Sequence, residues 1–79
     1  MIVPAQIRAA RALLDWRQID LAKAAGVSDP TIINFERGAT DPRASTLDAM
    51  RHALESAGVI FVEENGDGPG VRLRKVKKR

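Results

Sequence analysis

Apolar residues recur three or four positions apart through the first 58 residues, which is the spacing of amphipathic helices. This pattern predicts four helices, over Pro4–Leu14, Gln18–Ala25, about 28–37 and about 45–57. Ser28 is suited to cap the third helix, and Ser45 or Thr46 to cap the fourth. Gly26, Gly38 and Gly58 are expected to end the second, third and fourth helices.

The pattern changes after residue 58. Val59–Val62 is a β-branched and aromatic run, residues 65–70 form a strong turn signal, and residues 71–74 alternate with period two. This order predicts a β-hairpin, which must pack on the helices or pair with another chain because an isolated hairpin is marginally stable. The fold class is therefore mainly α, with a helical domain over residues 1–58, a hairpin over 59–76 and a basic tail over 77–79.

Length and composition narrow the possible functions. Seventy-nine residues make one small domain, and no apolar run is long enough to cross a membrane. The start of the chain lacks the basic and apolar segments of a secretion signal, so we expect a cytoplasmic protein without a membrane partner. With no cysteine, a single histidine and no catalytic set or phosphate-binding loop, we expect no metal, no cofactor and no enzyme activity.

The net charge of +3 is unevenly distributed. Residues 72–79 hold six cations and no acid, so residues 1–71 combine the remaining seven cations with all ten acids, a net charge of −3. A cationic end of this kind either contacts nucleic-acid phosphates or is a solvated tail that improves solubility.

Two short helices joined by the three-residue turn Gly26–Ser28 form the pattern of a helix-turn-helix. The residues Gln18–Ser28, Thr31-Ile32 and Glu36–Gly38 resemble the Cro and phage-repressor family, also called the XRE family, over residues 6 to about 57. The resemblance implies a lambda-repressor-like bundle of four to five helices, with the third helix entering the major groove of DNA.

The resemblance also implies an ion pair between Arg11 and Glu36 that fixes the pose of the third helix. The alternative is an exposed pair that contributes little to stability. Trp16, the only tryptophan, is expected to pack in the interior rather than on DNA, because a duplex offers no unstacked base.

Carried over residue by residue, the family pattern puts Asp29, Pro30, Thr31 and Asn34 at the base-reading positions. Asn34 can make a bidentate contact with adenine, and Thr31 can meet a thymine methyl group. Asp29 departs from the family's usual residues, and it either accepts from cytosine or only complements the helix dipole.

Four further residues are candidates for contacts with DNA phosphates: Arg17, Gln18, Arg37 and Arg43. Gln18 matches the family residue at the start of the second helix, where backbone N–H groups also favour an anion. Arg17 replaces the usual Ser or Thr, so the helix loses a side-chain cap and gains a cation. Each of the four could instead be a solvated surface group.

The hairpin lies outside the family's shared core. We expect it to form a homodimer that sets two third helices about 34 Å apart on one face of DNA. The candidate contacts are Val59, Phe61, Val71 and Leu73. The alternative, a hairpin packed on its own fourth helix, accounts for the same apolar residues.

The sequence therefore predicts a sequence-specific, double-stranded-DNA-binding transcriptional regulator, a repressor that binds an inverted repeat as a homodimer. One alternative is an antitoxin that binds a toxin and also represses its own operon. Another is a protein-interaction module that has lost DNA binding, which the −3 balance of residues 1–71 and the acid Asp29 would favour.

Overall fold

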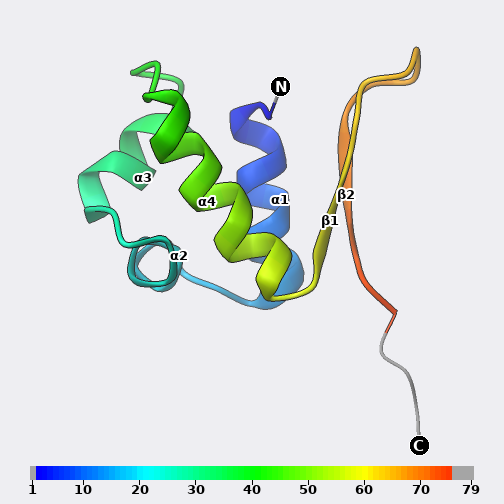
Figure 1. The fold of residues 1–79 in the computed structure, drawn as a ribbon. Helices are drawn as coiled ribbons and strands as arrows, with labels where there is room; N and C mark the ends of the chain where they lie inside the picture. The colour runs from blue at the N-terminus through cyan, green and yellow to red at the C-terminus, as the bar shows by residue number, and fades with distance from the viewer. Residues whose placement is uncertain (1, 76–79) are drawn as a thin grey trace, which may run out of the picture.

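The computed structural model describes residues 2–75. It contains four helices followed by an antiparallel hairpin, and Figure 1 shows the hairpin beside the helical bundle. The elements are α1 (Pro4–Leu14), α2 (Gln18–Ala25), α3 (Asp29–Glu36), α4 (Ala44–Ser56), β1 (Val59–Val62) and β2 (Gly70–Leu73). The mainly helical fold class predicted from the sequence is confirmed. The tail over residues 77–79, and residue 76 of the predicted hairpin segment, lie outside the described residues.

The helix ends follow from local chemistry. The turn after α2 begins at Gly26, whose φ of 72° is in the left-handed region that glycine adopts without a steric cost. Ser28 then caps α3, because its hydroxyl oxygen accepts the backbone N–H of Thr31 at 3.3 Å. These two ends set the sharp turn between α2 and α3, as the sequence predicts.

The start of α4 differs from the prediction. The helix begins at Ala44, with the extended Arg43 as its N-cap, and no side chain accepts its first N–H groups. Ser45 and Thr46 already lie within the first turn, because the Arg43 carbonyl accepts the N–H of Leu47 at 3.0 Å. The prediction that one of these hydroxyl groups caps the helix was therefore wrong.

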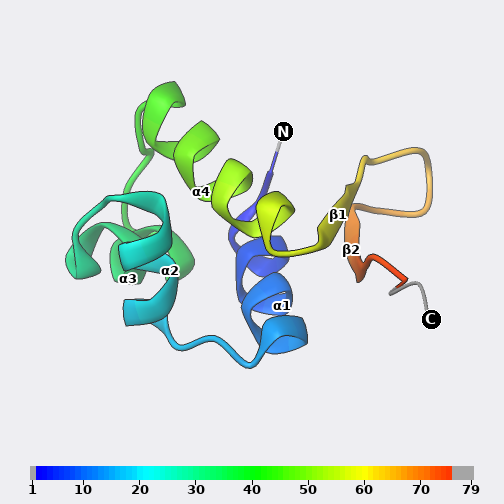
Figure 2. The same ribbon diagram turned by 60° about the horizontal axis from the view of Figure 1, so that its bottom comes forward.

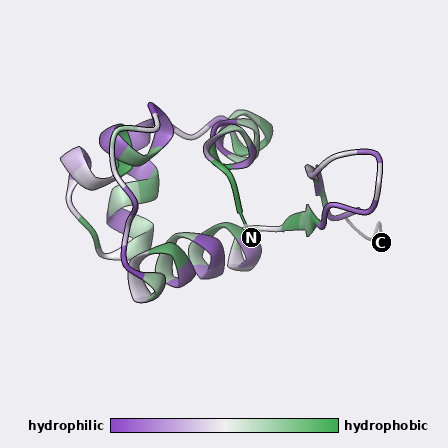
Figure 3. Ribbon diagram, turned by 90° about the horizontal axis from the view of Figure 1, so that it is seen from above, coloured by the Kyte–Doolittle hydropathy of each residue, from purple (hydrophilic) through white to green (hydrophobic). Residues whose placement is uncertain are grey.

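One apolar core joins all four helices to the hairpin. Its fully buried side chains are Ile7, Leu21, Ile32, Met50, Leu54 and Val59. Trp16 packs against this core, as expected, but is only half-buried, and His52 is exposed on α4 as expected. Figure 3 shows the hydrophobic colouring of β1 where the hairpin leaves the helices.

The hairpin packs on its own chain, which corrects part of the predicted dimer surface. Val59 is completely buried and Phe61 is 8% exposed, so neither is available for contact with another chain. They lie opposite Leu73 and Val71 in the strand register, and directly opposed residues share one face of the sheet. Val71 is half-buried against the core and Leu73 is 43% exposed, so only these two candidates remain accessible.

Two polar residues that the sequence analysis did not single out fasten the hairpin. The Gln6 side chain, 5% exposed, donates to the carbonyl oxygens of Gly70 at 3.0 Å and Val62 at 3.4 Å, and its Oε1 accepts the N–H of Val3. From α4, the Arg51 guanidinium lies 5.5 Å from the centre of the Phe61 ring. The first contact joins α1 to the hairpin, and the second joins α4 to β1.

No helix within residues 2–75 combines the length and the apolar character needed to cross a membrane.

The Gln6 contacts predict a large effect of Gln6→Ala. Removing the amide takes away three part-buried hydrogen bonds, one from the N–H of Val3 and two to the hairpin carbonyls of Gly70 and Val62, and each such bond contributes about 0.5–1.5 kcal/mol. We expect the free energy of unfolding to fall by about 2 kcal/mol in urea denaturation. His52→Ala on the exposed face of α4 is the control and should change it by less than about 0.5 kcal/mol. Equal effects of the two substitutions would contradict this role of Gln6.

Candidate nucleic-acid interface

The helix α3 lies at the surface, on the side of the bundle away from the hairpin (Figures 1 and 2). Only one side of it is buried, through Ile32, Phe35 and Glu36. The remaining side chains of its first two turns are exposed or half-buried. The helix therefore packs on the core along one side and presents its opposite face to solvent.

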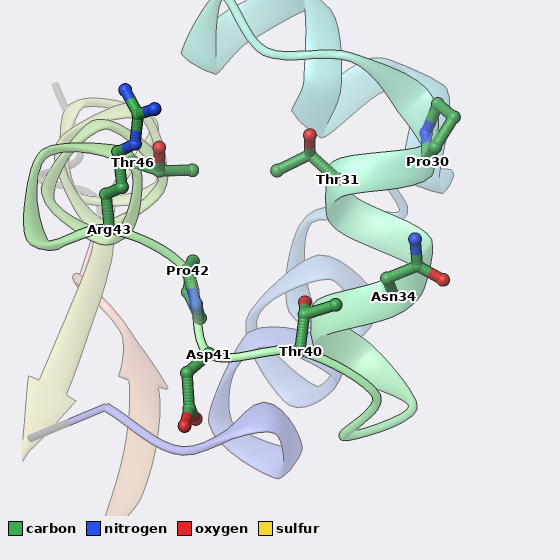
Figure 4. A pocket seen from close by; sticks show the side chains of 8 residues that line it. All are labelled: Pro30, Thr31, Asn34, Thr40, Asp41, Pro42, Arg43 and Thr46. Atoms are coloured by element: carbon green, nitrogen blue, oxygen red, sulfur yellow. The ribbon is translucent and has the colours of Figure 1, made fainter.

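A groove of about 370 Å³ lies between α3 and the segment that leads into α4. Figure 4 shows its lining: Pro30, Thr31, Asn34, Thr40, Asp41, Pro42, Arg43 and Thr46. Thr31 and Thr46 face each other across the groove, whereas the Asp41 carboxylate points away from them. Hydroxyl, amide and guanidinium groups thus dominate its polar surface, and these groups donate hydrogen bonds to phosphates and base edges. Thr46 also lines the groove, although its place in the sequence predicted only a helix cap.

The structure brings the four predicted base-reading residues together on the first two turns of α3. Asn34 is half-buried in the groove wall, and its amide has no hydrogen-bond partner among residues 2–75. The Thr31 hydroxyl is 2.8 Å from the Ser28 hydroxyl, which leaves the Thr31 methyl group to project. Asp29 and Pro30 are exposed, and Ser28 rather than Asp29 supplies the capping hydrogen bond.

Gln18 and Arg17 stand at the start of α2, and both side chains have partners in the protein. Gln18 Nε2 donates to Glu36 Oε1 at 3.1 Å, which leaves its second amide hydrogen for another acceptor. The exposed Arg17 guanidinium pairs with Asp20 at 3.1 Å. The side-chain hydrogen bond from Arg17 is the main reason why the pKa of the Asp20 carboxyl is lowered, and the Arg17 backbone N–H lowers it further.

Arg37 and Arg43 are exposed at the two ends of the loop between α3 and α4. Neither guanidinium has an ion-pair partner among the described residues. Arg43 also adjoins the N-terminus of α4, where no side chain caps the free N–H groups. A free helix N-terminus beside a cation favours an anion such as a phosphate.

Glu36 is the centre of the network that fixes α3. Its carboxylate, 4% exposed, accepts from Arg11 Nε at 2.6 Å and Arg11 Nη2 at 2.8 Å. The third nitrogen of Arg11 donates to the Trp16 carbonyl at 2.9 Å, and Arg8 donates to the Glu36 carbonyl. The predicted pair is thus bidentate and largely buried, and the exposed alternative is excluded.

Within residues 2–75, no three His, Cys, Asp or Glu side chains come together in a way that could hold a metal ion.

The four-helix bundle, the capped turn and the exposed α3 define a helix-turn-helix protein. A family model described as helix-turn-helix matches residues 7–57, which is more than half of the chain. The chain belongs to this family, of the Cro and phage-repressor type, as the sequence motif predicts.

The known proteins that are similar to this chain include a repressor domain and an antitoxin. One is the DNA-binding domain, residues 1–76, of the P22 C2 repressor, determined by nuclear magnetic resonance in solution. It is 38% identical with a TM-score of 0.63, and the match covers 70% of this chain and 72% of that domain. The other is the antitoxin HigA1 of Mycobacterium tuberculosis, 37% identical over 46 residues. That match covers 58% of this chain and 31% of the antitoxin.

The Arg11–Glu36 network predicts that Arg11→Met is strongly destabilising. The substitution keeps the aliphatic packing but leaves the Glu36 carboxylate buried without its cation, which costs about 3 kcal/mol or more. Urea denaturation at pH 7 measures the loss. The control is Arg17→Met, which breaks the pair between the exposed Arg17 and the half-exposed Asp20 and is expected to leave the midpoint almost unchanged. Similar midpoints for the two variants would show that the buried pair does not stabilise the fold.

Proposed function

We propose that this protein is a sequence-specific DNA-binding transcriptional regulator that inserts α3 into the major groove and represses transcription as a homodimer on an inverted repeat. The observation that carries the proposal is the pose of α3. The buried Arg11–Glu36 pair holds the helix, and its opposite face presents Thr31 and Asn34 without intervening structure. The likeness to the P22 repressor domain supports the same function.

The base-reading residues have separate chemical roles in this proposal. Asn34 makes a bidentate contact with adenine, because its free amide offers one donor and one acceptor. The Thr31 methyl group contacts a thymine methyl, since its hydroxyl is held by Ser28. Asp29 accepts from a cytosine amino group, and Pro30 packs against the neighbouring base edge or sugar.

Phosphate contacts come from both sides of α3. Gln18 donates its remaining amide hydrogen to a phosphate of one strand. Arg17 binds the same strand, because its guanidinium can leave Asp20 and pair with a phosphate instead. Arg43 and the free N-terminus of α4 bind the backbone on the other side of the groove, and Arg37 extends this contact. A two-fold dimer would repeat these contacts on a second half-site, one helical turn of about 34 Å or a multiple of it away.

The likeness to the antitoxin HigA1 favours a second candidate function. In this alternative the chain is an antitoxin that binds a toxin and represses its own operon through the same α3 surface. A small protein encoded next to this chain and recovered in complex with it would support the alternative. Cytoplasmic localisation fits both functions and stays a prediction.

Selection of DNA from a randomised duplex library tests the proposal and the role of Asn34 together. At about 150 mM salt, where non-specific attraction is weakened, the parent should enrich an inverted repeat that contains adenine opposite Asn34. Asn34→Ala should bind that site about 1–3 kcal/mol more weakly and lose the preference for adenine at that one position.

The matched control is Asn65→Ala in the hairpin loop, remote from α3, which should enrich the same repeat as the parent. If the parent enriches no motif, sequence-specific regulation is contradicted. If Asn34→Ala and the parent select identical repeats, DNA reading stands but the role of Asn34 does not.

The phosphate role of Arg43 predicts a change in salt dependence rather than in sequence preference. Arg43→Ala should weaken binding to all sequences alike and reduce the slope of log affinity against log salt by about 1. Titration of one duplex at several salt concentrations measures the slope. The Asn34→Ala variant is the control, because losing a base contact should lower the affinity without changing the slope. An unchanged slope for Arg43→Ala would contradict the contact.

A further inference from the structure

A second pocket lies on the other side of the loop that borders the DNA groove. Its volume is about 490 Å³. The start of the chain, the end of α3 and the start of α4 supply its lining: Ile2, Val3, Pro4, Phe35, Gly38, Thr40, Asp41, Pro42 and Leu47. This volume is within the range of about 300–1,000 Å³ that is usual for small-molecule sites. None of the proposed DNA contacts lies inside this second pocket.

Most of the surface of the second pocket is apolar. Ile2 is 6% exposed and Phe35 is 5% exposed, and both belong to the hydrophobic core, so the pocket reaches the edge of that core. Pro4, Pro42 and Leu47 are half-buried and extend the apolar surface outward. An apolar group that enters the pocket is therefore removed from water on several sides, which favours its binding.

Asp41 adds a negative charge to this apolar pocket. It is the one charged residue in the lining that the described chain supplies. Its carboxylate has no hydrogen-bond or ion-pair partner within residues 2–75. Figure 4 shows the Asp41 carboxylate and the Arg43 guanidinium pointing to opposite sides of the loop, so this neighbouring cation does not neutralise it. Because Asp41 is exposed, it can pair with a charged group at the rim of the pocket without being buried.

The backbone beside the second pocket offers little to an anion. The helix α1 begins at Pro4, which has no N–H, and the N–H of Val3 already donates to Gln6 Oε1 at 2.9 Å. At the end of α3, the N–H groups of Gly38 and Ala39 donate to carbonyl oxygens of the helix itself. The free carboxylate and the lack of free donors together select a cation.

One loop separates the second pocket from the DNA groove. Thr40, Asp41 and Pro42 line both cavities. The next residue is Arg43, which the proposed function assigns to a DNA phosphate. A ligand in the second pocket therefore contacts the segment that carries part of the DNA-binding surface.

We propose that the second pocket is a regulatory site for a small organic ammonium ion with an apolar body, and that this ligand strengthens DNA binding. The apolar body lies over Ile2 and Phe35, and the ammonium group donates to the Asp41 carboxylate at the rim. Because Asp41 also lines the DNA groove, pairing it with a cation removes a negative charge close to the phosphates. The regulatory role rests on the proposed function, whereas the site itself does not.

Titration of the full chain without DNA, followed by amide chemical shifts in nuclear magnetic resonance, tests the site. The probe is phenethylammonium, and its matched analogues are the neutral phenethyl alcohol and the anion hydrocinnamate. The ammonium ion should cause saturable shifts at Gly38, Thr40 and Leu47. The alcohol should bind about three- to fivefold more weakly, which corresponds to one exposed charge pair, and the anion more weakly still. No saturable shift, or equal binding of the ammonium ion and the alcohol, overturns the site.

Two variants with matched controls test the role of the charge. Asp41→Asn should reduce the affinity for phenethylammonium to that of the alcohol, whereas Asp67→Asn in the hairpin loop should leave it unchanged. Val3→Lys puts a tethered ammonium group beside the pocket and should compete with the probe. Ala5→Lys adds the same charge outside the lining and should not. If Asp41→Asn binds the probe as the parent does, the proposal is wrong.

The regulatory role is measured on a duplex that contains the selected repeat. Saturating phenethylammonium should tighten binding of the parent about two- to fivefold, and ammonium chloride at the same concentration should not. Because coupling is reciprocal, the duplex should raise the affinity for phenethylammonium by the same factor. An unchanged or weaker affinity for DNA overturns the regulatory role. If the probe binds but the chain selects no DNA motif, the proposed function and this regulation fail while the site stands.

Discussion

The buried ion pair between Arg11 and Glu36 is the interaction on which the exposed surface of this protein depends. A helix of eight residues is too short to be stable by itself, so α3 takes its position from what it packs against. Apolar contacts of Ile32 and Phe35 attach the helix, but the hydrophobic effect is non-directional. The two parallel hydrogen bonds from Arg11 fix direction as well as distance, because guanidinium and carboxylate are both planar.

The same carboxylate links three further parts of the site. Arg11 also donates to the Trp16 carbonyl, which ties the segment between α1 and α2 to the pair. Gln18 donates to Glu36, so the residue proposed to bind phosphate is oriented by the group that holds the reading helix. A protein must present base and phosphate contacts in one geometry for sequence reading to be sharp. This network couples both kinds of contact within the chain itself.

Most of this architecture could be predicted from the sequence, because it depends on residues close together in the chain. Apolar spacing and the turn at Gly26 located α2 and α3, and the family motif supplied Glu36 and its partner Arg11. The start of α4 was missed for a local reason: Ser45 and Thr46 have capping side chains, yet the helix closes its first turn on the Arg43 carbonyl. Nothing in the hydroxyl pattern indicates which carbonyl is used.

The role of Gln6 and the packing of the hairpin could not be predicted in this way. A glutamine between apolar positions of α1 is consistent with a surface residue, and its acceptors at Val62 and Gly70 are more than fifty positions away. Likewise, the alternation of Val59 and Phe61 shows that one face of β1 is apolar, but not whether that face meets its own helices or another chain. Only the packing on α1 and α4 decides this, and it leaves Val71 and Leu73 as the accessible candidates.

The location of the acids also answers the argument from net charge. The −3 balance of residues 1–71 suggested a surface unsuited to DNA, but a sum ignores where each charge lies. Glu36 is buried with Arg11, Asp20 is paired with Arg17, and Glu55 is paired with Arg51 on α4. Three further acids lie at the loop end of the hairpin, away from α3. Since surface charges interact over about 8 Å at physiological salt, these distant acids have little effect on a duplex at α3. The charge balance that affects DNA binding is the local one around α3. In that region the two unpaired cations Arg37 and Arg43 equal the acids Asp29 and Asp41 in number.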